Sequence, residues 1–144
     1  MKVGLMGFGR AGRAVARILL ESKETNLRWV IRRSSVLEHR SVPEFLGIQS
    51  DEPGLIYRSE EFTADELLDT HPVDFIVDFS SDTGIDYYGE AAVRHNTGII
   101  SAVSGYSPEQ LARLRALADH IPVMHSPNIT LGINFLIIAA QILK

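Results

Sequence analysis

The chain has 144 residues, of which 45% are hydrophobic and 22% charged, with a formal net charge of −4 and no cysteine. This length suits one domain with its own core, and the composition is that of an ordinary globular protein. The weakly acidic balance argues against a nucleic-acid-binding surface, and the lack of cysteine excludes disulfides, thiolate zinc sites and cysteine nucleophiles.

Short apolar runs alternate with segments of helical periodicity along most of the chain. Strands are predicted over residues 2–6, 27–31, 73–79, 98–103 and 122–125. Helices are predicted over residues 10–21, 64–69, 83–95 and 108–119, and Thr63 and Ser107 each begin a capping box. Because the strands alternate with helices rather than with hairpin turns, we expect an α/β fold with a doubly wound parallel sheet.

Helical spacing also predicts which side chains are buried. The inward face of the helix over residues 10–21 is expected to carry Ala11, Ala14, Val15, Ile18 and Leu19. The inward face of the helix over residues 108–119 is expected to carry Leu111, Leu114 and Ala118. Residues 34–61 are punctuated by Pro and Gly, so we expect loops there, with a short helix near residues 42–46.

A G-x-G-x-x-G motif directly follows the first predicted strand and opens the first predicted helix. In this context the first glycine permits a tight turn, the second lets the backbone approach a pyrophosphate, and the third lets helix and strand pack closely. The helix amino terminus adds free N–H groups and a positive dipole end. The motif predicts a Rossmann-type dinucleotide site formed by Gly7, Phe8, Gly9, Arg10, Ala11 and Gly12. A strand–helix turn that merely favours glycine is the alternative.

The end of the second predicted strand indicates which dinucleotide is preferred. Domains that prefer NAD usually carry an Asp or Glu about 20 residues past the glycines, where it accepts from the ribose 2′-hydroxyl. Here the sequence reads Ile31-Arg32-Arg33-Ser34-Ser35, without a carboxylate. Because guanidinium and hydroxyl groups suit a 2′-phosphate, we expect Arg32, Arg33 and Ser34 to favour NADPH, with NADH still possible. A solvated basic strand end is the alternative.

Three further strand ends, at residues 78–81, 101–106 and 125–128, are rich in small polar residues. The carboxyl ends of parallel strands meet at one edge, where open α/β sheets bind ligands. We therefore expect one crevice that contains Phe79, Ser80, Ala102, Val103, Ser104, Ser126, Pro127 and Asn128. The five histidines have no metal-ligand spacing, so no metal site is expected. Of these histidines, only His125 is predicted near the crevice.

The segment over residues 131–144 is predicted to be a helix that is apolar on nearly every side. It is too short to span a bilayer, and such a helix needs cover from a second domain or a partner chain. We therefore expect self-association into a homo-oligomer through residues 133–143, and no membrane partner. The first strand runs straight into glycines rather than into a signal peptide, which favours a cytoplasmic location.

These motifs together resemble the dihydrodipicolinate reductase family, the 4-hydroxy-tetrahydrodipicolinate reductases of lysine (diaminopimelate) biosynthesis. The resemblance rests on the glycine motif, on Val77-Asp78-Phe79-Ser80 and on Ala102-Val103-Ser104-Gly105, where the family has A/G-T-T-G. Its most specific element is the stretch over residues 126–134, close to the family's P/A-N-F/M-S-x-G-V-N. The chain departs from many members by a glycine loop one residue shorter, and Ile129 stands where a Phe or Met is usual.

The resemblance implies an amino-terminal cofactor domain over residues 1–128, with residues 129–144 leading into a second domain. Residues 7–12 would hold the pyrophosphate and Arg32 or Arg33 the adenosine ribose. Residues 102–104 and 126–129 would lie against the nicotinamide, and Ser104 would also face a small-molecule substrate, a cyclic unsaturated dicarboxylate that accepts a hydride. The family's paired-His and Lys segment lies beyond Asn134, so no catalytic residue is expected here. A related amino-acid or diamine dehydrogenase and a non-catalytic dinucleotide-binding module remain alternatives.

Overall fold

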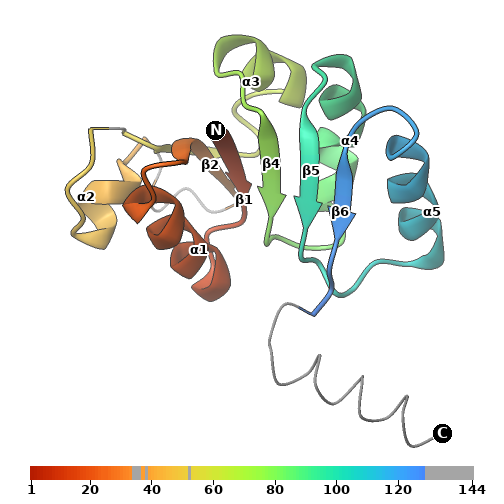
Figure 1. Ribbon diagram of the computed structural model, residues 1–144, viewed down its shortest axis with the longest axis horizontal. Coiled ribbons are helices and arrows are strands. Elements are labelled where there is room, and N and C mark those ends of the chain that lie inside the picture. Colours follow the sequence, from red (N-terminus) through yellow and green to blue (C-terminus); the bar gives the residue numbers. More distant parts are fainter. Residues whose placement is uncertain (34–36, 38, 52, 129–144) are drawn as a thin grey trace, which may run out of the picture.

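The computed structural model of the chain describes residues 1–33, 37, 39–51 and 53–128. The strands are β1 (Lys2–Met6), β2 (Asn26–Arg32), β3 (Leu55–Arg58), β4 (Phe75–Asp78), β5 (Gly98–Ser101) and β6 (Val123–His125). The helices are α1 (Arg10–Glu21), α2 (Val42–Leu46), α3 (Ala64–Thr70), α4 (Gly84–Arg94) and α5 (Pro108–Leu117). All strand pairings are parallel and the order is β3-β2-β1-β4-β5-β6 (Figure 1). This is the doubly wound Rossmann-type order, so the predicted fold class is confirmed.

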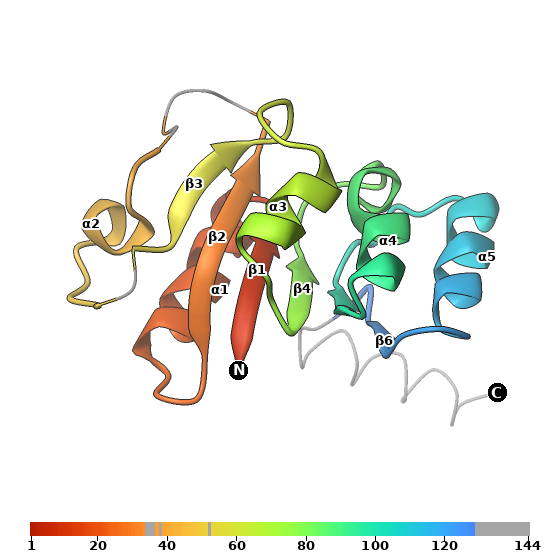
Figure 2. The same cartoon turned by 90° about the horizontal axis from the view of Figure 1, so that it is seen from above.

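Helices cover both faces of the sheet, and each face has its own apolar core. On one face α3, α4 and α5 lie side by side (Figure 2) and pack over Trp29, Ile76 and Ile99. On the other face α1 and α2 pack over Val3, Leu5 and Val30. Strand residues that alternate in direction supply both cores, because the central strands β1, β2 and β4 are buried on two sides.

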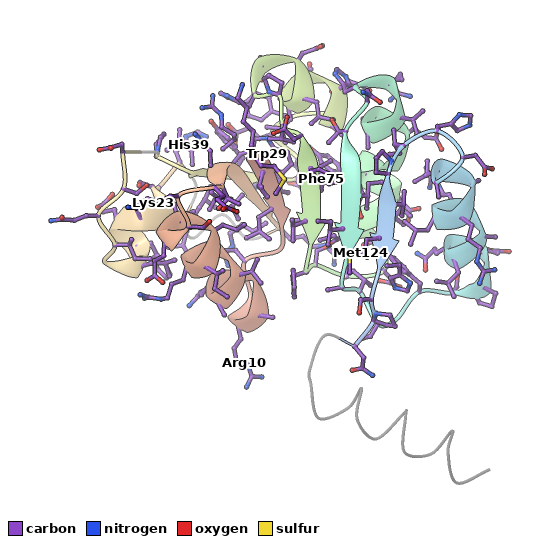
Figure 3. All side chains as sticks on the ribbon, in the orientation of Figure 1. Arg10, Lys23, Trp29, His39, Phe75 and Met124 are labelled. Carbon is purple, nitrogen blue, oxygen red and sulfur yellow. The ribbon has the colours of Figure 1, made fainter. Side chains whose placement is uncertain are left out.

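The second core does not reach the β6 edge of the sheet. In Figure 1 the face of β5 and β6 turned toward the viewer has no described helix over it, and Met124 there is 59% exposed (Figure 3). The helix predicted over residues 131–144 lies outside the described residues. Within the described part of the chain, no helix combines the length and apolar character that crossing a bilayer requires.

Two predicted helix starts have the expected capping boxes. The Thr63 hydroxyl accepts from the Glu66 backbone N–H, and the Glu66 carboxylate accepts from the Thr63 backbone N–H. The Ser107 and Gln110 side chains do the same at α5. Each pair satisfies two backbone donors that the first helical turn leaves free. The short helix near residues 42–46 is also confirmed, with Ser41 as its N-cap.

The structure corrects three of the sequence predictions. Strand β3 lies within the stretch expected to be loop, and it pairs with β2 from Trp29↔Leu55 to Arg32↔Arg58. The buried face of α1 is formed by Gly12 and Ala16, with Val15 and Leu19 only partly buried, whereas Ile18 is 66% exposed and Ala11 and Ala14 are exposed. In α5 the buried residues are Leu114 and Leu117, while Ala118 is exposed and Leu111 is half-buried.

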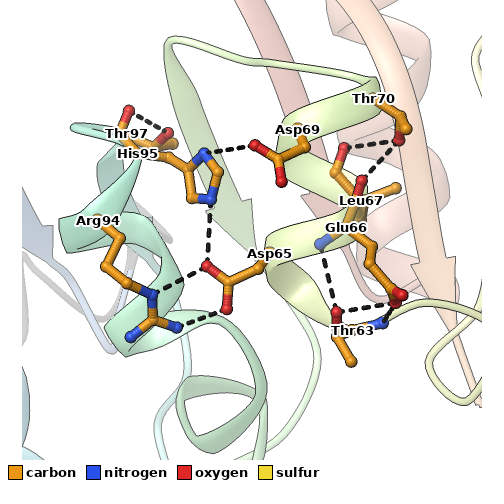
Figure 4. A network of polar contacts seen from close by, with 9 residues as sticks. All are labelled: Thr63, Asp65, Glu66, Leu67, Asp69, Thr70, Arg94, His95 and Thr97. Carbon is orange, nitrogen blue, oxygen red and sulfur yellow. Dashed lines mark hydrogen bonds and ion pairs between the residues drawn. The ribbon is translucent and has the colours of Figure 1, made fainter.

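Polar side chains join the start of α3 to the end of α4 (Figure 4). The Asp65 carboxylate accepts from Arg94 Nε at 2.9 Å and Nη2 at 2.6 Å, and it lies 3.1 Å from His95 Nε2. His95 Nδ1 lies 3.8 Å from the Asp69 carboxylate. The Arg94 hydrogen bonds hold the pKa of Asp65 below its usual value. Because all these groups are partly exposed, the cluster aligns two helices and adds little stability.

Candidate functional site

The glycine motif forms a tight turn between β1 and α1. Gly7 has φ +92° and donates to the Ile31 carbonyl at 2.9 Å, and a Cβ on it would lie 2.6 Å from the Phe79 carbonyl oxygen. A Cβ on Gly12 would lie 2.1 Å from the Gly7 carbonyl oxygen. A Cβ on Gly9 would meet no atom within 4 Å. The fold therefore requires Gly7 and Gly12 to be glycine, and it leaves Gly9 open to whatever approaches the loop.

Helix α1 begins at this loop with its first turn open. Gly9 is the N-cap and gives no side-chain hydrogen bond to the helix, and Arg10 and Ala11 are exposed. The Arg10 side chain extends away from the domain at this end of α1 (Figure 3). Free N–H groups and the positive end of the helix dipole therefore point out of the loop, which favours an anion there.

Phe8 supports the loop from inside. Its side chain is 3% exposed and its ring lies 5.6 Å from the ring of Phe45 on α2, measured between centroids. The Arg13 guanidinium lies 4.9 Å from the Phe45 ring centroid and 5.5 Å from that of Phe8, and Arg13 Nε donates to the Phe8 carbonyl. Because the Phe8 ring belongs to the core, any contact between Phe8 and a ligand at this loop would involve the Phe8 backbone.

A cavity of about 720 Å³ opens beside this loop, at the carboxyl ends of β1, β2 and β4. Seven predicted site residues line it: Gly7, Phe8, Gly9, Arg32, Arg33, Phe79 and Ser80. Ser81, from the predicted strand end 78–81, also lines it, and sequence analysis missed seven further lining residues: Met6, Ile31, Ser59, Thr83, Gly84, Asp86 and Tyr87. Three of the strand ends that the sequence motifs indicate, those of β1, β2 and β4, therefore converge on this cavity.

A second cavity of about 370 Å³ adjoins the first. It is lined by Ala11, Phe79, Ser80, Ser81, Asp82, Ala102, Val103, Ser104 and Gly105. The turn formed by residues 79–81, which follows β4, borders both cavities, so the two form one crevice along the carboxyl edge of the sheet. A crevice at the point where the strand order reverses is where open α/β sheets bind ligands.

The remaining predicted residues lie beside the crevice or outside the described part of the chain. Arg10 and Gly12 flank the glycine loop without lining either cavity. Ser126, Pro127 and Asn128 follow β6 and line neither cavity, although the Ser126 N–H donates to the Ser101 carbonyl at 2.9 Å. Ser34 and Ile129 lie outside the described residues.

A buried carboxylate shapes the turn between the two cavities. Asp78 is fully buried at the end of β4, and its Oδ1 accepts from the Ser80 N–H at 2.8 Å and the Ser80 hydroxyl at 2.6 Å. Its Oδ2 accepts from the Tyr88 hydroxyl at 2.8 Å, and the Tyr106 hydroxyl also interacts with it. Burial raises the pKa of Asp78, and the hydrogen bonds from Ser80 and Tyr88 offset this only in part.

His125 joins the end of β6 to the loop after β5. Its Nε2 lies 2.9 Å from the Val103 carbonyl oxygen, and its ring packs 5.4 Å from the Tyr106 ring between centroids. The Tyr106 hydroxyl lies 3.0 Å from Ser101 Oγ, which in turn accepts from the Val103 N–H. His125 therefore helps to fix the Val103 backbone beside the second cavity. The expectation that His125 lies near the crevice is confirmed.

Sequence reasoning missed two features of the site. The Asp78 cluster has one sequence signal, a carboxylate inside an apolar strand, but its partners are distant in the sequence: Tyr88 lies on α4 and Tyr106 in the loop after β5. The Arg33 guanidinium donates hydrogen bonds to the Ser81 and Thr83 hydroxyls in the larger cavity, and the sequence spacing of these residues does not predict this contact.

Comparison with known proteins places the chain in a family. Residues 1–129 match the family described as "Dihydrodipicolinate reductase, N-terminus". The 4-hydroxy-tetrahydrodipicolinate reductase of Syntrophotalea carbinolica is 33% identical over 134 residues, which cover 88% of this chain and 46% of that protein. The enzyme of the same name from Oleidesulfovibrio alaskensis is 28% identical over 138 residues, or 95% of this chain and 48% of that protein. The chain thus spans about half the length of these relatives.

Solved structures agree on the fold. The dihydrodipicolinate reductase of Paenisporosarcina sp. TG-14, solved with dipicolinate, matches with a TM-score of 0.67 at 15% identity, over 89% of this chain and 47% of that one. An amine dehydrogenase from Mycobacterium smegmatis matches with a TM-score of 0.65 at 21% identity, over 87% of this chain and 38% of that one. At such identities these structures support the Rossmann-type fold alone. The family match over residues 1–129 settles the relationship: the chain belongs to the dihydrodipicolinate reductase family and corresponds to its amino-terminal region.

Proposed function

We propose that the chain binds a nicotinamide dinucleotide along the crevice and is the cofactor domain of a 4-hydroxy-tetrahydrodipicolinate reductase. One observation carries the proposal. The open position at Gly9, next to the uncapped start of α1, borders the cavity that Arg32 and Arg33 also line. A ligand with a central pyrophosphate and a further phosphate at one end matches this distribution of positive charge.

The residues present fit the parts of such a cofactor. Gly9 and the first turn of α1 would hold the pyrophosphate, because their backbone N–H groups face a space that no side chain fills, and Gly7 would form the tight turn before them. Arg32 and Arg33 would hold the adenosine ribose at the β2 end of the larger cavity. The smaller cavity, with Ala102, Val103 and Ser104, would take the nicotinamide.

The proposed reaction is reduction of a cyclic unsaturated dicarboxylate. When bound, the reduced nicotinamide supplies the hydride. This chain's part is to orient the cofactor along the sheet edge, with Ser104 facing the substrate and residues 126–128 closing the nicotinamide end. The relatives are about twice as long as this chain. The proton donor and the Lys that binds the substrate are proposed to lie in their second half.

Titration by calorimetry tests the binding proposal directly. The chain should bind NADPH with about micromolar or tighter affinity, and it should bind ATP more weakly because ATP lacks the nicotinamide half. Absence of NADPH binding by a folded chain would contradict the proposal. Binding of NADPH without turnover, even with the second half of a relative added in trans, would favour a non-catalytic dinucleotide module.

We expect NADPH to bind more tightly than NADH, because Arg32 and Arg33 stand where an acidic residue would repel a 2′-phosphate. The double variant Arg32→Ala/Arg33→Ala should lose this preference. A lost charge-assisted contact costs roughly 1.5–3 kcal/mol, so the NADPH affinity should fall by about 10- to 100-fold while NADH changes little.

The matched control is Arg40→Ala/Arg115→Ala, which removes the same charge from two exposed positions that line neither cavity. A similar loss of NADPH affinity in this control would show that the effect is one of net charge. Equal affinities for the two cofactors in the original chain, unchanged in the site variant, would contradict the predicted preference.

A further inference from the structure

Three polar side chains from two separate strand ends meet in the larger cavity. Arg33 follows β2, and Ser81 and Thr83 lie in the loop between β4 and α4. Arg33 Nη2 donates to Ser81 Oγ at 2.7 Å and also to Thr83 Oγ1, and the two hydroxyl oxygens lie 3.2 Å apart. All three residues line the cavity, so the cluster faces the space where a ligand would bind.

The cluster carries a positive charge that its own members do not neutralise. Both partners of Nη2 are neutral hydroxyls, and no carboxylate of the described residues forms an ion pair with Arg33. The nearby cavity residue Asp86 is instead paired with Arg113 at 2.7 Å. A guanidinium has five donors, and each hydroxyl can donate as well as accept. Arg33, Ser81 and Thr83 together therefore offer donors from several directions to one oxyanion.

The helix does not need the Thr83 hydroxyl. Thr83 is the N-cap of α4, but its side chain makes no capping hydrogen bond and it is exposed. The Ser81 hydroxyl has only Arg33 Nη2 and Thr83 as side-chain partners among the described residues. Since neither hydroxyl supports the fold elsewhere, both are free to turn toward a ligand.

We propose that Ser81 and Thr83 complete, with Arg33, a three-point subsite for the 2′-phosphate of the cofactor. This rests on the proposed function and adds specificity residues from the β4–α4 loop to those expected at the end of β2. A phosphate monoester has three terminal oxygens, which match one guanidinium and two hydroxyl donors. The hydroxyls also hold the long Arg33 side chain in place beforehand, which lessens the rotamer freedom lost on binding.

The experiment compares two probes that differ only in the 2′-phosphate: adenosine 2′,5′-bisphosphate and 5′-AMP. Both are titrated against the full 144-residue chain, the double variant Ser81→Ala/Thr83→Val and Arg33→Ala. Because Ser81→Ala/Thr83→Val removes two hydrogen bonds to a charged group, its affinity for the bisphosphate should fall by about 10-fold or more. The affinity for 5′-AMP should stay within about 2-fold. Arg33→Ala should likewise lose affinity for the bisphosphate and not for 5′-AMP, and its loss should be larger than that of the double variant.

The matched control is Ser22→Ala/Thr70→Val, which removes the same two hydroxyls from positions outside the crevice. The Ser22 hydroxyl accepts from the Glu24 N–H and the Thr70 hydroxyl donates to the Glu66 carbonyl. This control should bind both probes as the original chain does. It should also match the site variant in melting temperature to within a few degrees.

Three outcomes would overturn the subsite. An unchanged bisphosphate affinity in Ser81→Ala/Thr83→Val would show that the hydroxyls do not touch the phosphate. An increased affinity would show that they hold Arg33 away from it. If the original chain binds neither probe and does not bind NADPH, the proposed function is contradicted as well. If the original chain binds NADPH but the double variant keeps its bisphosphate affinity, only the subsite is contradicted.

Discussion

Replacing Gly9 with valine should abolish dinucleotide binding and leave the domain folded. The Gly9 backbone has φ −77° and ψ −164°, an extended conformation that a β-branched residue adopts readily. A Cβ there meets no atom within 4 Å, so the side chain fits the protein but occupies the space in front of the α1 amino terminus. A pyrophosphate could not then reach the backbone N–H groups. We expect an affinity loss of at least about 100-fold, or roughly 2.8 kcal/mol.

Gly12→Val is the informative contrast. Its Cβ would lie 2.1 Å from the Gly7 carbonyl oxygen, so α1 could not keep its place against β1. This variant should lose binding and thermal stability together, whereas Gly9→Val should lose binding alone. Calorimetric titration with NADPH, alongside circular dichroism and thermal melts, separates the two effects. Retained NADPH affinity in a natively folded Gly9→Val would mean that the glycine loop serves only the turn.

The fold was predictable because strand and helix signals alternate strongly along the sequence. Strand β3 was not predicted because its four residues follow Pro53 and Gly54, and so short a segment shows no clear alternation of apolar and polar residues. It forms because β2 offers it an open edge, which is a tertiary effect. The capping boxes at Thr63 and Ser107 were readable because they depend on residues only three positions apart.

The error in α1 has a physical cause. Sequence patterns weight large aliphatic residues, so Ile18 was expected inside. The helix instead approaches β1 closely through Gly12 and Ala16, whose small size permits contact with the glycine loop, and this turns Ile18 outward. At the start of α1, close packing against the glycine loop therefore determines the buried face more than hydrophobicity does.

The site was predictable to the level of strand ends but not of contacts. The carboxyl ends of parallel strands lie at one edge, so the residues that follow β1, β2, β4 and β5 had to be neighbours. Which loop side chains bond to each other depends on loop conformation, and Arg33 with Ser81 and Thr83 is one such pairing. Asp78 is another case, because its partner Tyr88 comes from a helix on one face of the sheet.

Tyr88→Phe should destabilise the domain in a pH-dependent way. The Tyr88 hydroxyl donates to the buried Asp78 carboxylate at 2.8 Å, and burial raises the pKa of Asp78. A raised folded-state pKa means that the folded chain binds the proton more tightly than the unfolded chain. The contribution of Asp78 to stability is therefore full below its unfolded pKa and is lost as pH rises through the folded pKa. Removing the Tyr88 hydroxyl raises the pKa of Asp78 further.

The expected loss is largest toward the alkaline end of the range from pH 4 to pH 8, about 1.5–3 kcal/mol once Asp78 is ionised and loses a charge-assisted hydrogen bond. The loss should decrease toward about 1 kcal/mol as the pH falls and Asp78 takes up its proton, because a protonated Asp78 loses only a neutral hydrogen bond. Tyr87→Phe is the matched control, since the Tyr87 hydroxyl donates to the Phe62 backbone carbonyl at 2.8 Å. Burial raises the pKa of Tyr87 to about 12, so its effect should be the same across this range. Urea denaturation of both variants from pH 4 to pH 8 measures the difference. A Tyr88→Phe loss that does not change with pH would mean that the Asp78 charge does not depend on this hydroxyl.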